Sequence, residues 1–238
     1  MNQINIQYYK TKVGELILGS HQHKLCLLDF RYRRMRLTVD NRIKKGLNAE
    51  YIERDDDVLK NTRNQLDEYL NGDRTQFELP LLTVGTDFQK QVWDALMKVP
   101  YGVTSTYLQL AKNIHNEKAV RAVATANGAN SIGLIIPCHR IIGSDGELVG
   151  YAGGLPTKKR LLKLEQSHFT LTDDEKYHFI GHKETKYDGF FFTSVKTTGI
   201  FCLPSCRAKK PNQENVIFYD TKNEAIKNGY RPCKICNP

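Results

Sequence analysis

The sequence lacks the run of about 20 apolar residues that a membrane-spanning helix needs. Its first ten residues, MNQINIQYYK, also lack the apolar core of a signal peptide, so we expect a cytoplasmic protein with no membrane partner. Internal repeats and low-complexity tracts are missing too. Hydrophobic residues make up 40% and charged residues 26%, which excludes collagen-like, coiled-coil or wholly disordered chains.

Acidic residues are in deficit. The chain has 35 Lys and Arg against 26 Asp and Glu among 238 residues, a formal net charge of +9. Such a surplus favours a polyanion partner, most often nucleic acid. It is equally typical of a basic enzyme with scattered surface lysines, so charge alone does not decide. The length allows one large domain or two small ones.

Cysteine is scarce until the C-terminus: only Cys26 and Cys138 precede residue 200. The other four form a C-x3-C pair and a C-x2-C pair, namely Cys202, Cys206, Cys233 and Cys236. Without a secretion signal, this spacing indicates a metal site rather than disulfides. Four thiolates favour one tetrahedral Zn²⁺ ion, whose usual role is structural.

Local patterns predict an α/β region before residue 80. Alternating apolar and polar positions predict short strands within residues 4–11, 14–20 and 24–33. Leucines at helical spacing predict a helix over residues 57–72, with Gly72 near its end. The polar segment 44–57 has the composition of a solvated loop.

The next block is predicted to be mainly helical. Thr86 and Gln89 form a capping-box pattern for a helix that stops before Pro100. Two short helices, 107–113 and 118–128, flank a brief turn, which fits a helix-turn-helix or a simple helical hairpin. An apolar strand, a glycine-rich loop and a last helix follow, over residues 132–137, 143–154 and 157–166.

The pattern changes between Ser167 and Asp173, where we place a domain boundary. A short capped helix is expected within 171–183. Two strands and a helix that begins at a capping box should follow, over residues 190–198, 215–219 and 221–228. About 70 residues make a small core, and a zinc ion is a common way to stabilise one.

Cys138 is followed directly by His139, after an apolar run. A thiol is nucleophilic as a thiolate, and a neighbouring histidine can take its proton, usually when a carboxylate orients that histidine. Spacing alone is weak evidence for such a site, and it favours the alternative of a buried, inert cysteine beside a surface histidine.

The surrounding residues favour reactivity. The segment IIPCHRIIGSDGELVGYAGG resembles the active-site segment of O6-alkylguanine-DNA alkyltransferases, and VPYGVTSTYLQLA, AVRAVATANGAN and LLKLE resemble its flanks. The resemblance implies a ribonuclease-H-like subdomain over residues 1–80 and a catalytic, DNA-binding subdomain with a helix-turn-helix over residues 84–166. It implies irreversible transfer of an alkyl group from O6-alkylguanine, and from O4-alkylthymine, to one cysteine, so that each molecule acts once.

The same resemblance implies roles for individual residues. Cys138 is the acceptor, His139 takes its proton through a water, and Glu165 orients the histidine. Asn130 braces the active-site turn. The remaining positions face an extruded base or the gap it leaves: Tyr107 as a proton or hydrogen-bond donor to the base, Arg121 in the base stack, and Tyr151 and Ala152 in the loop against the base. Alanines 119, 122 and 126 would let a helix approach DNA closely, or serve ordinary helix packing.

The C-terminal segment YDGFFFTSVKTTGIFCLPSCRAKKP and its continuation resemble the zinc-binding domain of Ada proteins. This implies a small α+β domain over residues 168–238, in which Cys202 both binds zinc and accepts methyl from a DNA methylphosphotriester. Methylation would reduce the charge of the site from −2 to −1 and raise DNA affinity. The resemblance implies that four residues face phosphate: Thr198, Arg207, Lys209 and Arg231. The alternative interpretation is that they are ordinary solvated surface residues.

Two departures accompany this resemblance. Leu203 stands where the family often has arginine, which removes one expected phosphate contact. The zinc domain also comes last in the chain, without room for the regulatory unit that commonly follows it in Ada proteins.

Taken together, the sequence predicts a monomeric repair protein for alkylated double-stranded DNA, with one zinc ion and no small-molecule cofactor. A methylation-sensing transcription regulator and a zinc-stabilised module that binds lesions without repairing them are the alternatives. His21, His23 and Cys26 form a weak second metal candidate, for which a clear fourth ligand is lacking, and Cys26 has the character of a small core residue.

Overall fold

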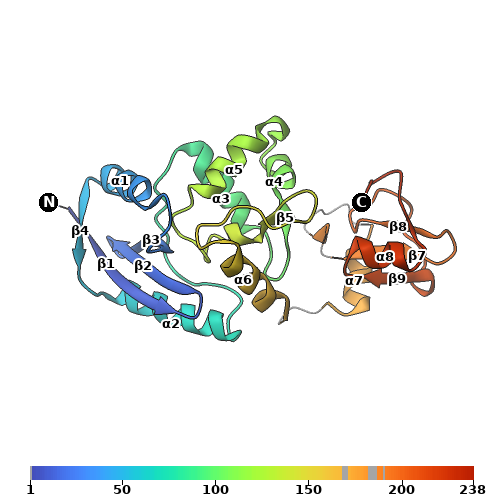
Figure 1. Ribbon diagram of the computed structural model, residues 1–238, viewed down its shortest axis with the longest axis horizontal. Helices are drawn as coiled ribbons and strands as arrows, with labels where there is room; N and C mark the ends of the chain where they lie inside the picture. The colour runs from blue at the N-terminus through green and yellow to red at the C-terminus, as the bar shows by residue number, and fades with distance from the viewer. Residues whose placement is uncertain (1, 168–170, 182–186, 190) are drawn as a thin grey trace. The chain divides into compact units, whose positions relative to one another are not determined.

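The structure is a computed structural model that describes residues 2–167, 171–181, 187–189 and 191–238. The chain divides into two compact units, residues 1–102 with 106–168, and residues 103–105 with 169–238 (Figure 1). The domain boundary expected at residue 168 lies outside the described residues. Within the described ranges, no helix is both long enough and apolar enough to cross a membrane.

The first unit begins with a four-stranded sheet in the order β3-β2-β1-β4. Neighbouring strands are antiparallel, except that β4 runs parallel to β1. The strands are β1 (Asn2–Thr11), β2 (Gly14–His21), β3 (Lys24–Phe30) and β4 (Ala49–Glu53). The first three confirm the alternation that predicted them.

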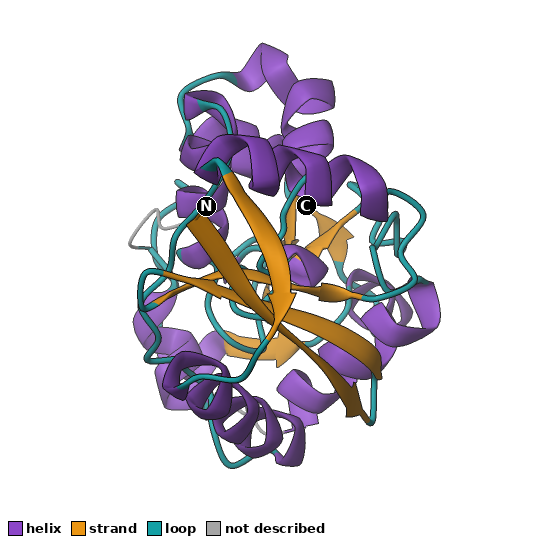
Figure 2. Ribbon diagram, turned by 90° about the vertical axis from the view of Figure 1, so that its left-hand side faces the viewer, coloured by secondary structure: helices purple, strands orange, loops and turns teal. Residues whose placement is uncertain are grey.

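Two helices lie on opposite sides of this sheet (Figure 2). Helix α1 (Arg36–Leu47) packs Val39 and Ile43 into one apolar cluster with Ile4 and Ile6 of β1. On the other side of β1, Asn5 and Tyr9 donate hydrogen bonds to the acidic side chains Asp56 and Asp67. These two carboxylates belong to the N-cap and the body of α2 (Asp57–Asn71), the helix expected over residues 57–72.

The prediction of a loop over residues 44–57 is wrong. Residues up to Leu47 belong to α1, and residues 49–53 form β4. The parallel pairing of β4 with β1, from Asn2 opposite Ala49 to Ile6 opposite Glu53, supplies the backbone hydrogen bonds that a polar composition does not reveal. Asn48 makes the reversal between helix and strand possible because it adopts a left-handed conformation, with φ of 46°.

The second half of this unit is mostly helical, as expected. Thr86 and Gln89 form the predicted capping box, and the helix that follows ends before Pro100. Helices α4 and α5 flank a turn at His115 and Asn116, with a 3-10 turn between them, which confirms the helix-turn-helix. The elements are α3 (Asp87–Met97), α4 (Tyr107–Asn113), η1 (Glu117–Ala119), α5 (Val120–Gly128), η2 (Cys138–Arg140) and α6 (Leu155–Ser167), with two-residue strands β5 (Ser105–Thr106) and β6 (Ile141–Ile142).

Arginines from the N-terminal half of this unit hold the C-terminal end of α5. Arg33 donates to the carbonyl oxygens of Gly128 at 2.6 Å and Asn130 at 2.9 Å, and also to the buried Asp29 carboxylate at 2.7 Å. Arg42 donates to the carbonyl of Ala129 at 2.7 Å. Both cations thus meet the negative end of the helix dipole and satisfy carbonyls that have no partner within the helix.

Residues 132–137 do not form the predicted strand. Apart from one bridge between Ile132 and Leu28, they fold as turns, with Leu134 at a φ of 65°. The Asn130 side chain donates to the carbonyl of Ile136 at 2.8 Å and accepts from the amide of Ile132 at 2.9 Å. Side-chain bonds of this kind replace the pairing that a strand would need.

Among its described residues, the second unit contains a sheet in the order β10-β8-β7-β9, two α-helices and a 3-10 turn. Its capped helices begin at Thr172 and Thr221, each of which forms a complete capping box. Residue 190, the first of a predicted strand, lies outside the described residues. The elements are α7 (Asp173–Phe179), β7 (Phe192–Val195), β8 (Ile200–Cys202), η4 (Gln213–Asn215), β9 (Val216–Tyr219), α8 (Lys222–Lys227) and β10 (Arg231–Pro232).

Candidate active site and metal centre

Cys138 begins the 3-10 turn η2 and is only 6% exposed. The turn braced by Asn130 delivers it there, so these two predicted residues lie together. Burial raises the pKa of the Cys138 thiol, and the hydrogen bond with Asn130 partly opposes that shift. The thiol is therefore neutral at rest, and its reactivity depends on a group that accepts its proton.

His139 and Glu165 form the predicted pair. Nε2 of His139 lies 2.8 Å from Oε1 of Glu165, and both side chains are fully buried. The ring therefore presents Nδ1 away from the carboxylate, and Nδ1 has no hydrogen-bond partner among the described residues. Because Nε2 faces a carboxylate, it carries the proton of the neutral ring and leaves Nδ1 as a base.

Glu165 also binds groups that the sequence did not indicate. Arg140 donates to its two oxygens, each at 2.9 Å. The hydroxyl of Tyr69, from α2, donates to Oε1 at 2.6 Å, and the amide of Gly102 donates to Oε2 at 3.2 Å. Tyr69 lies 96 residues from Glu165 in the chain, a separation that no local pattern could reveal.

These contacts set the charges of the site. Burial alone would raise the pKa of the Glu165 carboxyl, but His139 and Arg140 outweigh it and hold that pKa well below its usual range. Burial lowers the pKa of His139, although the neighbouring carboxylate opposes this. At neutral pH the site thus holds an ionised Glu165, a cationic Arg140 and a neutral imidazole.

Lys158 is a second residue that the sequence did not single out. Its side chain is fully buried and donates to the carbonyls of Val149, at 2.6 Å, and Ile141. Burial lowers its pKa to about 8, and a negative charge on Cys138 opposes that shift when the thiol ionises. A buried cation that the Cys138 charge influences would in turn favour the thiolate.

The other predicted residues surround this centre at different depths. Tyr107 starts α4 and is half-buried, and Tyr151 packs edge-on against Phe30 with ring centroids 5.5 Å apart. Burial is the main cause that raises the pKa of both tyrosines, and the Cys138 charge adds to it. Ala152 is half-buried beside Tyr151, whereas Arg121 is exposed on α5.

The three alanines of the helix-turn-helix differ in burial. Ala126 is 2% exposed, and its carbonyl accepts from Trp93 Nε1 at 2.9 Å, so this residue serves packing. Ala122 is exposed and Ala119 is half-buried. Only the latter two leave a small side chain on an accessible surface.

The four C-terminal cysteines meet in space. Their Sγ atoms all lie within 4.8 Å of one another, which brings together the ends of β8 and β10. The backbone amide of Leu203 donates to Cys236 Sγ, and that of Ile235 donates to Cys233 Sγ, each at 3.4 Å. Four converging sulfurs with amide donors fit a tetrahedral, thiolate-bound metal ion.

The weaker metal candidate is not assembled. Nδ1 of His21 bonds with the carbonyl oxygen of Gln3 at 2.8 Å, and Cys26 is fully buried in the N-terminal core. Burial raises the pKa of Cys26 to about 12, which opposes metal binding as a thiolate. In the part of the chain that the structure describes, the four C-terminal cysteines are the one group of three or more candidate ligands that could hold an ion.

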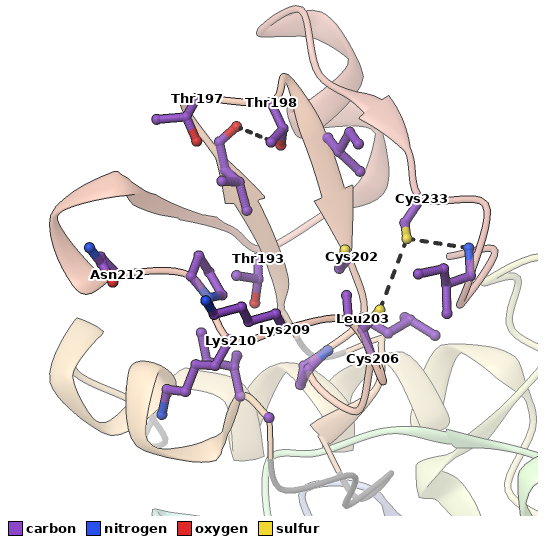
Figure 3. A pocket seen from close by; sticks show the side chains of 18 residues that line it. Thr193, Thr197, Thr198, Cys202, Leu203, Cys206, Lys209, Lys210, Asn212 and Cys233 are labelled. Carbon is purple, nitrogen blue, oxygen red and sulfur yellow. Dashed lines mark hydrogen bonds between the residues drawn. The ribbon is translucent and has the colours of Figure 1, made fainter.

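The predicted phosphate-facing residues of the second unit are all exposed: Thr198, Arg207, Lys209 and Arg231. Two of them, Thr198 and Lys209, line a cavity of about 400 Å³ that also includes Cys202 (Figure 3). Arg207 and Arg231 are not among its lining residues. Leu203 lines the cavity and packs against the core cluster formed by Phe192, Phe201 and Ala225.

Comparison with protein families accounts for most of the chain. Residues 4–83 match the model "6-O-methylguanine DNA methyltransferase, ribonuclease-like domain", and residues 87–167 match the DNA binding domain of the same enzymes. Residues 175–238 match "Metal binding domain of Ada".

Individual relatives agree. A methylated-DNA–protein-cysteine methyltransferase of Methanosarcina barkeri is 42% identical over 159 residues, which cover 67% of this chain and 95% of that protein. One from Haemophilus influenzae is 38% identical, covering 70% and 88%. The crystal structure of the Mycobacterium tuberculosis O6-methylguanine methyltransferase superposes with a TM-score of 0.59 at 34% identity, covering 71% and 96%.

The fold and the site thus define a protein built on the alkyltransferase scaffold. The chain belongs to the methylated-DNA–protein-cysteine methyltransferase family, and it carries a metal-binding domain of the Ada type after the methyltransferase domains.

Proposed function

We propose that this protein repairs alkylated double-stranded DNA by transferring the alkyl group of O6-alkylguanine, and of O4-alkylthymine, irreversibly to Cys138. The observation that carries the proposal is the buried His139–Glu165 pair next to that thiol. One solved relative with 34% identity and a TM-score of 0.59 is the Mycobacterium tuberculosis enzyme in complex with DNA, which supports DNA as the partner.

The geometry suggests how the thiol is activated. Nδ1 of His139 is the ring nitrogen left available, and it takes the Cys138 proton. In the resembling family, a water molecule relays this proton. The imidazolium that forms then lies 2.8 Å from the Glu165 carboxylate. The thiolate attacks the alkyl carbon in line, the carbon–oxygen bond breaks, and guanine keeps the electron pair. The C–S bond is a thioether, a poor leaving group, so the protein is consumed.

The base must leave the duplex to reach a thiol that is 6% exposed. We assign Tyr107 as hydrogen-bond donor to the extruded base, and Tyr151 and Ala152 as its loop wall. Arg121, exposed on α5, would fill the gap in the stack. Asn130 holds the turn that presents Cys138.

We assign the second unit a metal and a second transfer. Cys202, Cys206, Cys233 and Cys236 would hold one Zn²⁺ ion, and the bound ion would keep their sulfurs deprotonated. Cys202 would accept methyl from a DNA methylphosphotriester. Thr198, Arg207, Lys209 and Arg231 would contact the phosphate backbone, and the loss of one thiolate charge would strengthen that contact. Leu203 offers no cation where an arginine is common, so this contact rests on the other four residues.

Peptide mass mapping tests both assignments. The zinc-loaded protein is incubated with duplex DNA that carries O6-methylguanine and methylphosphotriesters. We expect one methyl group on the Cys138 peptide and one on the Cys202 peptide. The Cys138→Ala variant should bind the DNA but leave its O6-methylguanine unrepaired. Repair by that variant would refute the first assignment. Methyl on Cys138 alone would refute the second assignment and leave the C-terminal unit as a DNA clamp.

A further inference from the structure

The sheet of the second unit has two chemically distinct faces. Along β7 and β8, Phe192 and Phe201 point to one side and form a core cluster with Ala225 of α8. Side chains alternate along a strand, so Thr193 and its cross-strand partner Cys202 point to the other side. That side lines the cavity of about 400 Å³, and Thr193 and Cys202 are both among its lining residues (Figure 3).

Thr193 is an anomaly within this cavity. It is 3% exposed, and its Oγ1 atom has no hydrogen-bond partner among the described residues. A buried hydroxyl without a partner lowers stability, and such groups are rare in folded proteins unless a water or ligand binds them. Thr193 also lies directly opposite Cys202 in the antiparallel register, so a group bound to one is within reach of the other.

The rest of the lining indicates what the cavity would hold. Its walls are mainly apolar, with Val195, Ile200 and Pro211 among them, whereas Lys209 and Lys210 add positive charge. Lys210 lies over the ring of Tyr177 at 4.2 Å, which holds that ammonium group in place. The cavity therefore combines an unpaired hydroxyl, apolar walls and positive charge. A neutral ester would match all three features, because it has an alkyl carbon and an oxygen that accepts a hydrogen bond, and it becomes an anion when the alkyl group leaves. A DNA alkylphosphotriester is such a group.

We infer that Thr193 is a substrate-binding residue, whose hydroxyl donates to an oxygen of the alkylated phosphate during transfer to Cys202. This inference rests on the second transfer of the proposed function. In the step, the carbon–oxygen bond of the ester breaks, and the carbon forms a bond to Cys202 sulfur. The electron pair stays on the phosphate oxygen, which becomes a diester anion.

The hydrogen bond from Thr193 would strengthen as this anion forms. A donor that meets a developing charge in a buried site stabilises the transition state more than the ground state. The lysines contribute charge to the same change, but from exposed positions that solvent screens. The buried hydroxyl is therefore the group whose loss should affect the rate most specifically.

The test compares two adjacent residues. Thr193→Val removes the hydroxyl and keeps the shape of the side chain. Ser194→Ala is the matched control, because Ser194 is also fully buried, and its Oγ also has no partner among the described residues. Ser194 lies on the other face of β7, where its cross-strand partner is Phe201. It is not among the cavity-lining residues.

Each variant, loaded with Zn²⁺, is mixed with DNA that carries methylphosphotriesters and O6-methylguanine, and methyl on each cysteine peptide is followed with time. We expect Thr193→Val to slow transfer to Cys202 by roughly tenfold, the effect of one hydrogen bond to a charged group. Transfer to Cys138 in the same molecules and the zinc content should stay as in the wild type. The melting temperature should not fall, because the variant removes a buried hydroxyl that has no partner among the described residues of the free protein. Thr193→Ser should restore most of the rate, and Ser194→Ala should leave it unchanged.

The outcomes separate the two proposals. If wild-type protein places no methyl on Cys202, the second transfer of the proposed function fails. If wild-type protein methylates Cys202 and Thr193→Val does so at the same rate, the role of Thr193 is overturned while the function stands. A lower melting temperature of Thr193→Val with normal transfer would show that the hydroxyl binds a structural water, which also overturns the inference.

Discussion

At the scale of single residues, the chemistry of the first unit centres on Glu165. Its two carboxylate oxygens accept hydrogen bonds from Tyr69, Gly102 and Arg140. One of these oxygens, Oε1, also faces Nε2 of His139. Each partner restrains the carboxylate, and the carboxylate restrains the imidazole. The orientation of the imidazole next to Cys138 is therefore a collective property of these groups.

Tyr69 offers a direct test of this arrangement. Tyr69→Phe keeps the ring and removes a donor to Glu165, so we expect the free energy of unfolding to fall by about 1–2 kcal/mol and transfer to Cys138 to slow about fivefold. Without the Tyr69 donor, more of the Glu165 negative charge acts on the imidazole, so the pKa of His139 should also rise. An NMR titration of the imidazole would measure this change.

Tyr101→Phe is the matched control for this variant. Tyr101 is buried and packs edge-on against Tyr69, with ring centroids 6.0 Å apart, but its hydroxyl has no hydrogen-bond partner among the described residues. Its loss should leave the transfer rate and the pKa of His139 unchanged. Equal effects of the two variants would contradict a specific role for the Tyr69 hydroxyl.

Acid should destabilise the first unit through two groups. The pKa values of His139 and Glu165 are both lowered in the folded protein, so the unfolded chain binds their protons more readily. The stabilisation is present above the unfolded values, about 6.5 and about 4.3, and is lost as pH falls toward the folded ones. Urea unfolding at pH 7.5, 5.5 and 4 should show a stepwise decrease in the free energy of unfolding.

The first of these steps belongs to the histidine. In His139→Gln the decrease between pH 7.5 and 5.5 should disappear, while the decrease below pH 5 should remain. A wild-type stability that stays constant from pH 7.5 to 5.5 would show that the folded imidazole does not resist protonation.

At the scale of secondary-structure elements, the end of α5 depends on arginines from the N-terminal half. Arg33→Lys keeps the charge but replaces a planar fork that serves Asp29 and two backbone carbonyls. We expect a loss of about 2 kcal/mol in the free energy of unfolding, measured by chemical denaturation. Arg34→Lys, at an exposed position, is the control and should change stability little. Similar losses in both variants would contradict the role of the fork.

The elements also show which features sequence reasoning can reach. The capping boxes at Thr86 and Thr221 and the alternation of the first three strands were predictable because each signal lies within a few residues. Strand β4 was not, because its pairing with β1 joins residues that are 47 positions apart, such as Asn2 and Ala49. The apolar run 132–137 has the composition of a strand, and the Asn130 side chain decides otherwise.

The site shows the same division. Cys138, His139 and the four C-terminal cysteines carried recognisable spacing. Tyr69 carried none, because an isolated tyrosine in an amphipathic helix has the pattern of a core residue. Lys158 likewise resembles any lysine of a basic helix until the structure shows it fully buried. Contacts between distant segments are the part of a site that local patterns omit.

At the scale of the whole molecule, metal removal should affect the two units differently. The second unit is small, and its four cysteines join the ends of two strands. Chelation should unfold it, as limited proteolysis with mass mapping of residues 171–238 would show. Transfer to Cys138 should persist, because the described contacts of its site involve no C-terminal cysteine. Loss of that transfer after chelation would contradict this independence.

The dispersed origin of the groups around Glu165 has a consequence for the protein during its synthesis. Tyr69, Gly102, Arg140 and Glu165 come from four segments, and the carboxylate is the last of them to leave the ribosome. Until it arrives, the His139 ring next to Cys138 has no carboxylate to orient it. Under the proposed function, in which each molecule reacts once, the Cys138 thiol of a nascent chain therefore stays unreactive until the Glu165 carboxylate has folded into place.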